Sequence, residues 1–163
     1  MVELQLVELV ARVRFSLAAP ASNLNWYNLC MKKGFKENIE EASLENIDFR
    51  RVLYTGEHSQ LVLMSLKPNE EIGMEVHPDN DQFFRFEKGQ GRVIVDSTTY
   101  EVSDGDVVII PRGAEHNVVN TSQTESLKLY TLYAPPHHAD GIVRVTKEEA
   151  VANEAEFDGV TTE

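Results

Sequence analysis

The sequence predicts an all-β fold, an antiparallel barrel or jelly roll of short strands. From Arg50 onward, segments rich in β-branched and aromatic residues follow one another closely. Gly, Pro, Asn and Asp punctuate these segments, as in the runs Pro78–Asp81 and Lys88–Gly91. Many short strands with little helix between them are typical of closed or double-sheet antiparallel folds.

Apolar residues and turns together place the strands in the barrel region and the helices at its ends. The expected strands are Arg50–Tyr54, Gln60–Leu66, Ile72–His77, Gln82–Glu87, Gly91–Asp96, Thr98–Val102, Val107–Ile110, His116–Thr121 and Leu127–Tyr133. A turn of helix is expected at Asn38–Ser43. The capping-box sequence Thr146–Glu149 is expected to open a short C-terminal helix.

Composition limits the class of protein. At 163 residues the chain is long enough for one domain with a substantial core. Its formal net charge of −12 makes nucleic acid and anionic membrane surfaces poor partners. No apolar run approaches the roughly 20 residues that a membrane span needs. The single cysteine, Cys30, excludes an internal disulfide framework, and the lack of an export signal predicts a cytoplasmic protein.

Both ends of the chain differ from the barrel domain, which we expect to span residues 31–150. Residues 1–30 are interpreted as a non-native or disordered extension. The run Val13–Phe15 can be encoded by the T-arm consensus of a transfer-RNA gene, with Pro20 in frame on a terminal CCA. We therefore expect translation to begin at Met31, the alternative being a floppy extension that is translated. Residues 151–163 are expected to be an acidic tail.

Four side chains of the expected barrel could share one metal ion. Residues two apart in a strand project to the same side, so Glu75 and His77 can both point inward. The turn chemistry of Pro78–Asp81 predicts a hairpin that brings Gln82 opposite His77 on the neighbouring strand. His116 would arrive from a distant strand after a Pro-Arg-Gly turn.

A carboxylate, two imidazoles and a carboxamide oxygen suit a divalent metal, and Mn, Fe, Ni and Zn are all compatible with this set. Two imidazoles and one carboxylate also match the composition of the facial triad of non-haem Fe(II) enzymes. The alternative is a metal-free barrel in which Glu75 and Gln82 hydrogen-bond the two histidines.

Two motifs of fixed spacing run through the barrel region. The pattern G-x5-P-x-G-x2-H-x3-N is met without exception, and the pattern G-x5-H-x-H-x4-E-x6-G is met in spacing with altered residues. The matching positions are Gly105, Pro111, Gly113, His116 and Asn120 for the complete motif, and Asn69, Glu75, His77, Gln82 and Gly89 for the altered one. These motifs resemble the signature of the cupin superfamily over roughly Leu53–Pro135.

The resemblance implies a double-stranded β-helix, a jelly-roll barrel that holds a divalent ion. By position, Glu75 stands where cupins have the first histidine ligand and Gln82 where they have the glutamate. The carboxylate has moved rather than vanished, so the ligand charge is unchanged. Residues 31–150 are also similar to small bacterial cupins labelled mannose-6-phosphate isomerase-like, which share the run His77–Gly89, although that label rests on fold. The resemblance further implies a homodimer.

The leading functional expectation is a metal-dependent enzyme that acts on a small oxygen-rich molecule by isomerase, lyase or dioxygenase chemistry. The runner-up is a non-enzymatic barrel that binds a sugar-like ligand, with or without metal. A metal-free barrel that makes a protein contact is the third possibility. Arg112 is the one arginine in the motif frames with a plausible inward view, and its place in a turn argues against a phosphosugar.

Several other residues allow two interpretations. Strand alternation turns Phe84 and Phe86 inward, where they are expected to be core, with a pocket wall as the alternative. His137 and His138 are expected in an exposed tail, or else folded over the barrel mouth as acid–base groups. Tyr130 is expected to be a core aromatic, or else a pocket hydroxyl.

Overall fold

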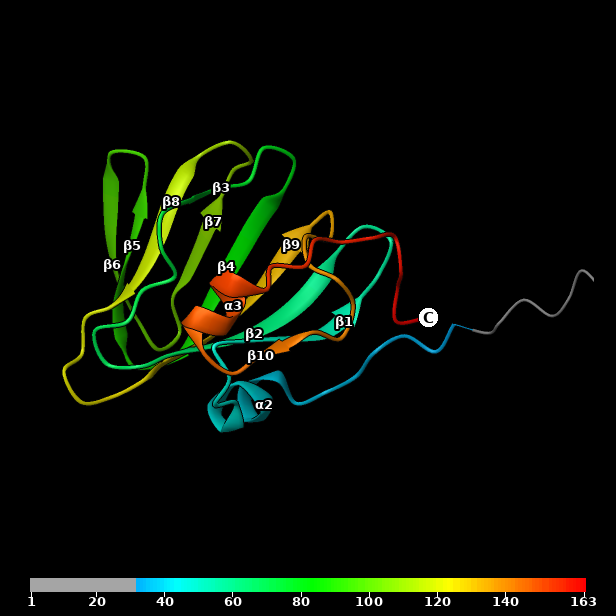
Figure 1. Cartoon of the computed structure of the whole chain (residues 1–163). Coiled ribbons are helices and arrows are strands. Elements are labelled where there is room, and N and C mark those ends of the chain that lie inside the picture. The colour runs from blue at the N-terminus through cyan, green and yellow to red at the C-terminus, as the bar shows by residue number, and fades with distance from the viewer. Residues whose placement is uncertain (1–31) are drawn as a thin grey trace, which may run out of the picture. The chain divides into compact units, whose positions relative to one another are not determined.

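The computed structural model describes residues 32–163, of which residues 34–163 form one compact unit. The expectations for residues 1–30 and for a start at Met31 fall outside the described residues. Two antiparallel sheets face one another, with two short helices beside them in this part of the chain (Figure 1). The all-β jelly-roll prediction is confirmed. Neither of these helices is long and apolar enough to cross a membrane.

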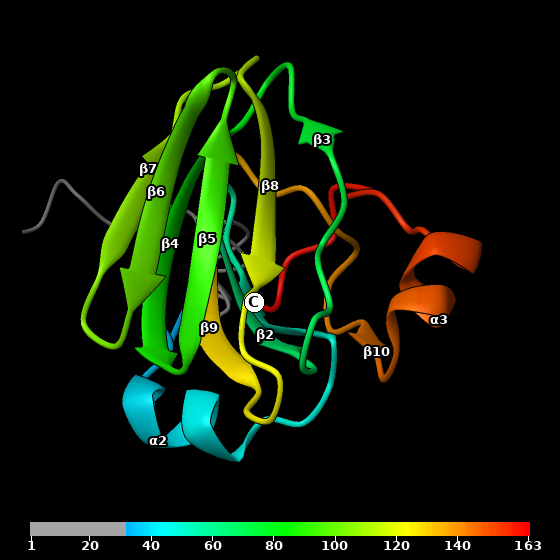
Figure 2. The same ribbon diagram turned by 90° about the vertical axis from the view of Figure 1, so that its left-hand side faces the viewer.

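The larger sheet has the strand order β10-β1-β2-β9-β4-β7. The smaller sheet has the order β3-β8-β5-β6 and faces the viewer in Figure 2. The strands are β1 (Arg50–Thr55), β2 (Gln60–Leu66), β3 (Glu75–Val76), β4 (Asp81–Lys88), β5 (Gln90–Val95), β6 (Thr98–Ser103), β7 (Val107–Ile110), β8 (Glu115–Asn120), β9 (Leu127–Ala134) and β10 (Val143–Arg144). Strands that are distant in sequence lie side by side, such as β9 between β2 and β4. This arrangement lets residues far apart in the chain reach one site.

The strand predicted at Ile72–His77 is largely irregular, and only Glu75–Val76 forms β3. Gly73 interrupts the pleat with a φ of 113°, a conformation that glycine adopts readily. The Ile72 N–H still donates to the Val118 carbonyl at 2.9 Å. The segment therefore follows β8 without forming a continuous ladder.

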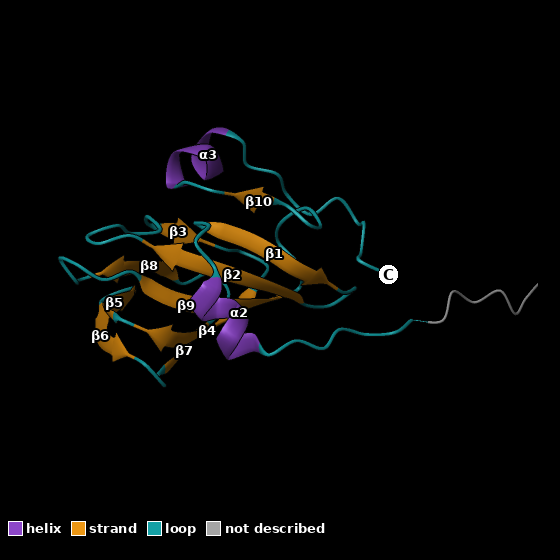
Figure 3. Cartoon of the chain, turned by 90° about the horizontal axis from the view of Figure 1, so that it is seen from below, coloured by secondary structure: helices purple, strands orange, loops and turns teal. Residues whose placement is uncertain are grey.

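The two helices form in the two end segments where the sequence predicted them. Both extend beyond the residues named in the prediction. α2 (Ile39–Glu45) lies against β9, β2 and β4 of the larger sheet (Figure 3). α3 (Lys147–Ala152) begins after Thr146, whose hydroxyl accepts a hydrogen bond from the Glu149 N–H at 3.2 Å. The Glu149 carboxylate accepts in turn from the Val145 N–H at 2.9 Å, one residue before the capping threonine.

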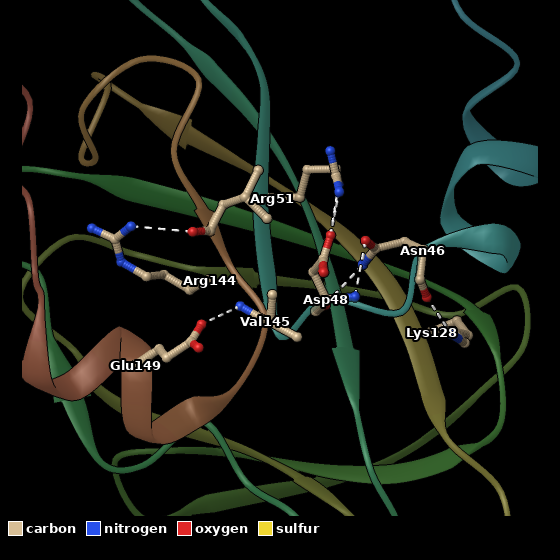
Figure 4. Close-up of polar contacts among 8 residues, drawn as sticks. Asn46, Asp48, Arg51, Lys128, Arg144, Val145 and Glu149 are labelled. Atoms are coloured by element: carbon tan, nitrogen blue, oxygen red, sulfur yellow. Dashed lines mark hydrogen bonds and ion pairs between the residues drawn. The ribbon is translucent and has the colours of Figure 1, made fainter.

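Polar contacts tie α2 and the C-terminal elements to the larger sheet (Figure 4). The Asp48 carboxylate, just after α2, accepts a hydrogen bond from Nε of Arg51 in β1 at 2.8 Å. The Asn46 carbonyl accepts from the ammonium group of Lys128 in β9. On the other side of β1, the short strand β10 pairs with it and leads the chain into α3. The sequence pattern did not predict β10.

The hydrophobic core lies between the two sheets. Phe84 and Phe86 are fully buried in it, which confirms their interpretation as core residues. Phe84 also reaches the metal-ligand candidates, because its ring centroid lies 6.3 Å from that of His116. On the opposite face of β4, Arg85 and Glu87 form an ion pair with an Nε to Oε1 distance of 3.6 Å.

The acidic segment 151–163 runs back along the barrel. The Phe157 N–H donates to the His137 carbonyl at 2.9 Å, and the Thr162 N–H donates to the Thr55 carbonyl, also at 2.9 Å. These main-chain hydrogen bonds hold the segment around His137 against the barrel.

Backbone geometry explains two positions of the altered motif. Gly89 has a φ of 96°, and a Cβ there would lie 2.7 Å from the Ser126 carbonyl oxygen, so no larger residue fits. Asn69 stands where the pattern has glycine and adopts a φ of 61°. Asparagine is one of the few residues other than glycine that tolerate this left-handed conformation. The substitution therefore preserves the turn.

The last residue of the complete motif, Asn120, joins three segments of the barrel. Its buried amide nitrogen donates to the carbonyls of Leu66, Lys67 and Glu125 at 3.0, 2.9 and 2.8 Å. Its amide oxygen accepts from the Ser122 N–H at 2.9 Å. A single side chain thus satisfies main-chain groups that the sheets leave unpaired.

We expect Asn120→Ala to lower the free energy of unfolding by about 3 kcal/mol, because several buried main-chain groups would lose their partner. Urea unfolding followed by circular dichroism measures this loss. Asn153→Ala is the control, since the Asn153 side chain is exposed and makes one 3.3 Å hydrogen bond. A loss no larger than that of the control would contradict the assigned role.

Candidate metal centre

Three of the four predicted ligands meet at one point on the inner side of the smaller sheet. In the antiparallel pairing of β3 and β8, Glu75 lies directly opposite His116, and His77 follows β3 by one residue. One ligand atom from each of these residues lies within 4.8 Å of the other two. His77 and His116 are buried and Glu75 is partly buried. This cluster could hold a metal ion.

Gln82 comes from the facing sheet, which corrects the predicted hairpin. β4 pairs with β7 and β9 rather than with β3, so Gln82 does not lie beside His77 on a neighbouring strand. The loop between the two strands instead crosses from one sheet to the other, and the Asn80 side chain fixes it by donating to the Pro135 carbonyl at 2.5 Å. Gln82 is nevertheless buried, and its Oε1 lies 3.0 Å from Nε2 of His116.

The two ring nitrogens of His116 face two oxygens. Nδ1 lies 3.1 Å from the Ala114 carbonyl and Nε2 lies 3.0 Å from Oε1 of Gln82. A neutral imidazole carries one N–H. If that hydrogen is on Nδ1 and bonded to Ala114, the Nε2 lone pair faces the amide oxygen, and a cation between these two acceptors would satisfy both. Burial lowers the pKa of His116, which keeps its ring neutral and able to ligate.

The buried Nε2 of His77 lies beside a carboxylate but makes no hydrogen bond of normal geometry. This nitrogen has no hydrogen-bond partner among residues 32–163. The nearby Oε2 of Glu75 lies at 3.4 Å, within ion-pair range but not in hydrogen-bonding geometry. The backbone of His77 is fixed, because the Gly113 N–H donates to its carbonyl at 2.8 Å. Buried polar atoms are nearly always paired, so this nitrogen is the strongest single indication of a ligand role.

The Glu75 carboxylate is kept ionised by its neighbours. Burial acts to raise its pKa, but the contact with His77 and the positive charge of Arg50 outweigh burial, and the pKa is lowered. Nη2 of Arg50 lies 3.8 Å from Oε1 of Glu75. The sequence analysis missed this buried arginine, although its position two residues before the apolar Val52 in one strand could have signalled an inward side chain.

His137 and His138 fold over the barrel end beside the site, which overturns the exposed-tail interpretation. His138 is buried, with Nε2 3.4 Å from the Tyr133 hydroxyl. The ring centroid of His137 lies 4.3 Å from that of His77. Burial, reinforced by the neighbouring His77, lowers the pKa of His137 to about 4. At neutral pH the uncharged His137 ring therefore packs against His77, a candidate metal ligand.

Tyr133, rather than Tyr130, is the tyrosine of the site. Tyr130 is partly buried on the outer side of the larger sheet, where its ring lies 6.2 Å from that of Phe83. Tyr133 is buried and makes an edge contact with the His77 ring at 5.6 Å. Burial raises the pKa of the Tyr133 hydroxyl, so this group stays protonated. Its pairing with Gln82 across β9 and β4 places it there.

The donor set fits a divalent transition metal. Two imidazole nitrogens and a carboxylate are common ligands of such ions, and an amide oxygen is a weaker neutral one. Ligand atoms in adjacent positions around an ion lie about 3 Å apart when each bond is about 2.1 Å. The pair Gln82 Oε1 and His116 Nε2, at 3.0 Å, meets this spacing, and the pair Glu75 Oε2 and His77 Nε2, at 3.4 Å, is close to it.

Comparison with known proteins identifies the family of the barrel domain. The model of the family described as "Cupin domain" matches residues 62–133, which include all four candidate ligands. The uncharacterized protein YrkC of Bacillus subtilis (strain 168) is 45% identical over 137 residues, covering 78% of this chain and 73% of that protein. The uncharacterized protein L612 of Acanthamoeba polyphaga mimivirus is 43% identical over 116 residues, covering 69% and 72%.

Solved structures share the fold of this chain. The crystal structure of BH2720 from Bacillus halodurans is 43% identical and superposes with a TM-score of 0.72, over 76% of this chain and 97% of that one. The cupin domain of Cnp3 from Schizosaccharomyces pombe, at 23% identity, shares the fold with a TM-score of 0.51 over 53% and 63%. The chain described here belongs to the cupin superfamily.

Proposed function

We propose that this cupin binds a divalent metal ion through Glu75, His77 and His116, with Gln82 as a fourth ligand, and acts on a small oxygen-rich molecule. The observation that carries the proposal is the buried Nε2 of His77, which has no hydrogen-bond partner among the described residues and lies 3.4 Å from a carboxylate oxygen. A carboxylate and two imidazoles around one point form a ready ligand set.

The metal-free alternative accounts for less of the geometry. Turning the Gln82 amide would let its nitrogen donate to Nε2 of His116, which satisfies one histidine. The same change leaves Nε2 of His77 buried with only the 3.4 Å contact to Glu75, which lacks hydrogen-bonding geometry. An ion satisfies both rings at once, which favours the metal-bound interpretation.

When bound, the ion would supply Lewis-acid chemistry for an isomerase or lyase, or Fe(II) chemistry with dioxygen. The protein residues would orient and shield it. The Ala114 carbonyl orients the His116 ring. The rings of His137 and Tyr133 pack against His77 and cover it from one side. Arg112 adds nothing to the finer likeness to mannose-6-phosphate isomerase, because it is solvent-exposed.

We expect protein purified without chelator to contain about one metal ion per chain by elemental analysis. Adding a chelator should lower the melting temperature by about 5 °C or more, because the ion stabilises only the folded state. His77→Ala and His116→Ala should lose both the metal and the chelator effect. His58→Ala is the control, since the His58 side chain is 93% exposed. Metal retained by the His77 and His116 variants would rule out these ligands.

Gln82→Glu should have opposite effects in the two states of the site. Without metal, the added buried carboxylate should destabilise the fold by about 2 kcal/mol. With metal, it becomes a charged ligand and should tighten binding by about tenfold. Thermal unfolding and metal titration measure both effects, with Gln90→Glu on the exposed start of β5 as the control. Equal destabilisation with and without metal would argue against an ion at Gln82.

Oxygen consumption by the Fe(II)-loaded protein, screened against 1,3-dicarbonyls and enediols, separates the reaction classes. A dioxygenase consumes oxygen with its substrate, whereas an isomerase or lyase works equally well under argon. In either case Glu75→Gln should lower turnover by at least about 100-fold, since even outer-shell partners of a metal are worth 10-fold to 100-fold. Turnover that survives this substitution would show that the ion is not the catalyst. Binding without turnover would favour the non-enzymatic alternative.

A further inference from the structure

Arg50, the first residue of β1, is a buried cation with few partners. Only 5% of the residue is exposed, and its Nε has no hydrogen-bond partner among the described residues. Its ion pair with Glu75 is long, with 3.8 Å between Nη2 and Oε1. The Phe49 ring lies 5.9 Å from the guanidinium carbon. Within residues 32–163, Nε is the guanidinium nitrogen that is both fully buried and without a hydrogen-bond partner.

Such an arrangement is unusual for arginine. The guanidinium stays charged at every physiological pH and carries five N–H donors in a planar fork. Burying it is costly unless its donors are paired. One long ion pair to Glu75 leaves most of them available. Arg50 is therefore equipped to bind an acceptor that comes from outside the described chain.

The position of Arg50 puts this fork beside the metal-ligand cluster. Its charge acts on Glu75 and on three aromatic residues around the barrel end, Tyr133, His137 and His138. The same end carries a groove of about 290 Å³, lined in part by His137 and by the carboxylates of Asp79 and Glu156, and neither Arg50 nor the candidate ligands belong to its lining. A small molecule that passed His137 and reached Glu75 would come close to Arg50, whose Nη2 lies 3.8 Å from Oε1 of that carboxylate.

The charges of the site select the kind of molecule. A divalent ion contributes two positive charges and Arg50 a third, against one negative charge on Glu75. Histidine binds a metal through its neutral form, and the Gln82 amide carries no charge. A buried site with this excess of positive charge favours a negatively charged ligand, and the excess exists only once the metal is bound.

We infer that Arg50 is a specificity-determining residue that binds the oxyanion group, carboxylate or phosphate, of a small ligand held beside the metal. The inference rests on the proposed function, because the metal supplies the second contact to the ligand. The planar fork matches the two oxygens of either group, which a lysine at the same place could not do as well. Neutral sugars are then poor ligands.

Calorimetric titration tests the inference with malonate, inorganic phosphate and the neutral isostere malonamide, each added to Co²⁺-loaded and to metal-free protein. We expect malonate or phosphate to bind the loaded protein and malonamide to bind at least tenfold more weakly. The anion that binds more tightly identifies the group. Arg50→Gln should weaken anion binding by about 10-fold to 100-fold, with an unchanged Co²⁺ stoichiometry. Arg112→Gln, at an exposed turn, is the control and should leave anion binding unchanged.

The outcomes separate this inference from the metal proposal. Two results would overturn the role of Arg50 and leave the metal site standing. In the first, Co²⁺-loaded wild-type protein binds neither anion. In the second, the wild type and Arg50→Gln bind the anions equally well. Wild-type protein that takes up no Co²⁺ overturns the metal proposal and, with it, the anion site that rests on the metal. If Arg50→Gln does not fold, Arg50→Lys replaces it. We expect Arg50→Lys to weaken anion binding about tenfold, because lysine lacks the planar fork. Unchanged anion binding would contradict the role of Arg50.

Discussion

The antiparallel register between β3 and β8 is the constraint on which the site depends. It places Glu75 directly opposite His116, although the two residues are far apart in sequence. The hydrogen bond from the Gly113 N–H to the His77 carbonyl then fixes the third ligand against the same turn. Because side chains alternate across a strand, a slip of one residue would turn Glu75 or His116 away from the cluster. The short β3 is held by few bonds of its own, so its position relies on these neighbours.

Much of this arrangement could be predicted from the sequence, because it follows from local rules. Two-residue alternation identifies Phe84 as an inward core residue, and motif spacing identifies Glu75, His77 and His116 as a cluster. The source of Gln82 could not be predicted in the same way. A turn-rich loop predicts a hairpin between neighbouring strands. Here the loop joins strands of different sheets, and the Asn80 side chain holds it by a hydrogen bond to the Pro135 carbonyl. Long-range contacts of this kind have no signature within the loop itself.

Sequence analysis missed Arg50 and Tyr133, which lie outside the motif frames. His138 also lies outside them and was expected in an exposed tail, with a fold over the barrel mouth as the alternative. All three are buried. Composition predicts arginine and paired histidines at the surface, and an acidic tail in solvent. The hydrogen bonds of residues 155–162 to the barrel reverse this expectation for the histidines. What looks like a tail in the sequence is a cover for the site in the structure.

Anomalous diffraction from a crystal of the Zn²⁺-loaded protein would locate the ion. We expect one strong peak at the zinc edge, about 2.0 to 2.2 Å from a carboxylate oxygen of Glu75 and from Nε2 of both His77 and His116. Peaks confined to surface residues, with the Nε2 of His77 hydrogen-bonded inside an ion-free barrel, would contradict it.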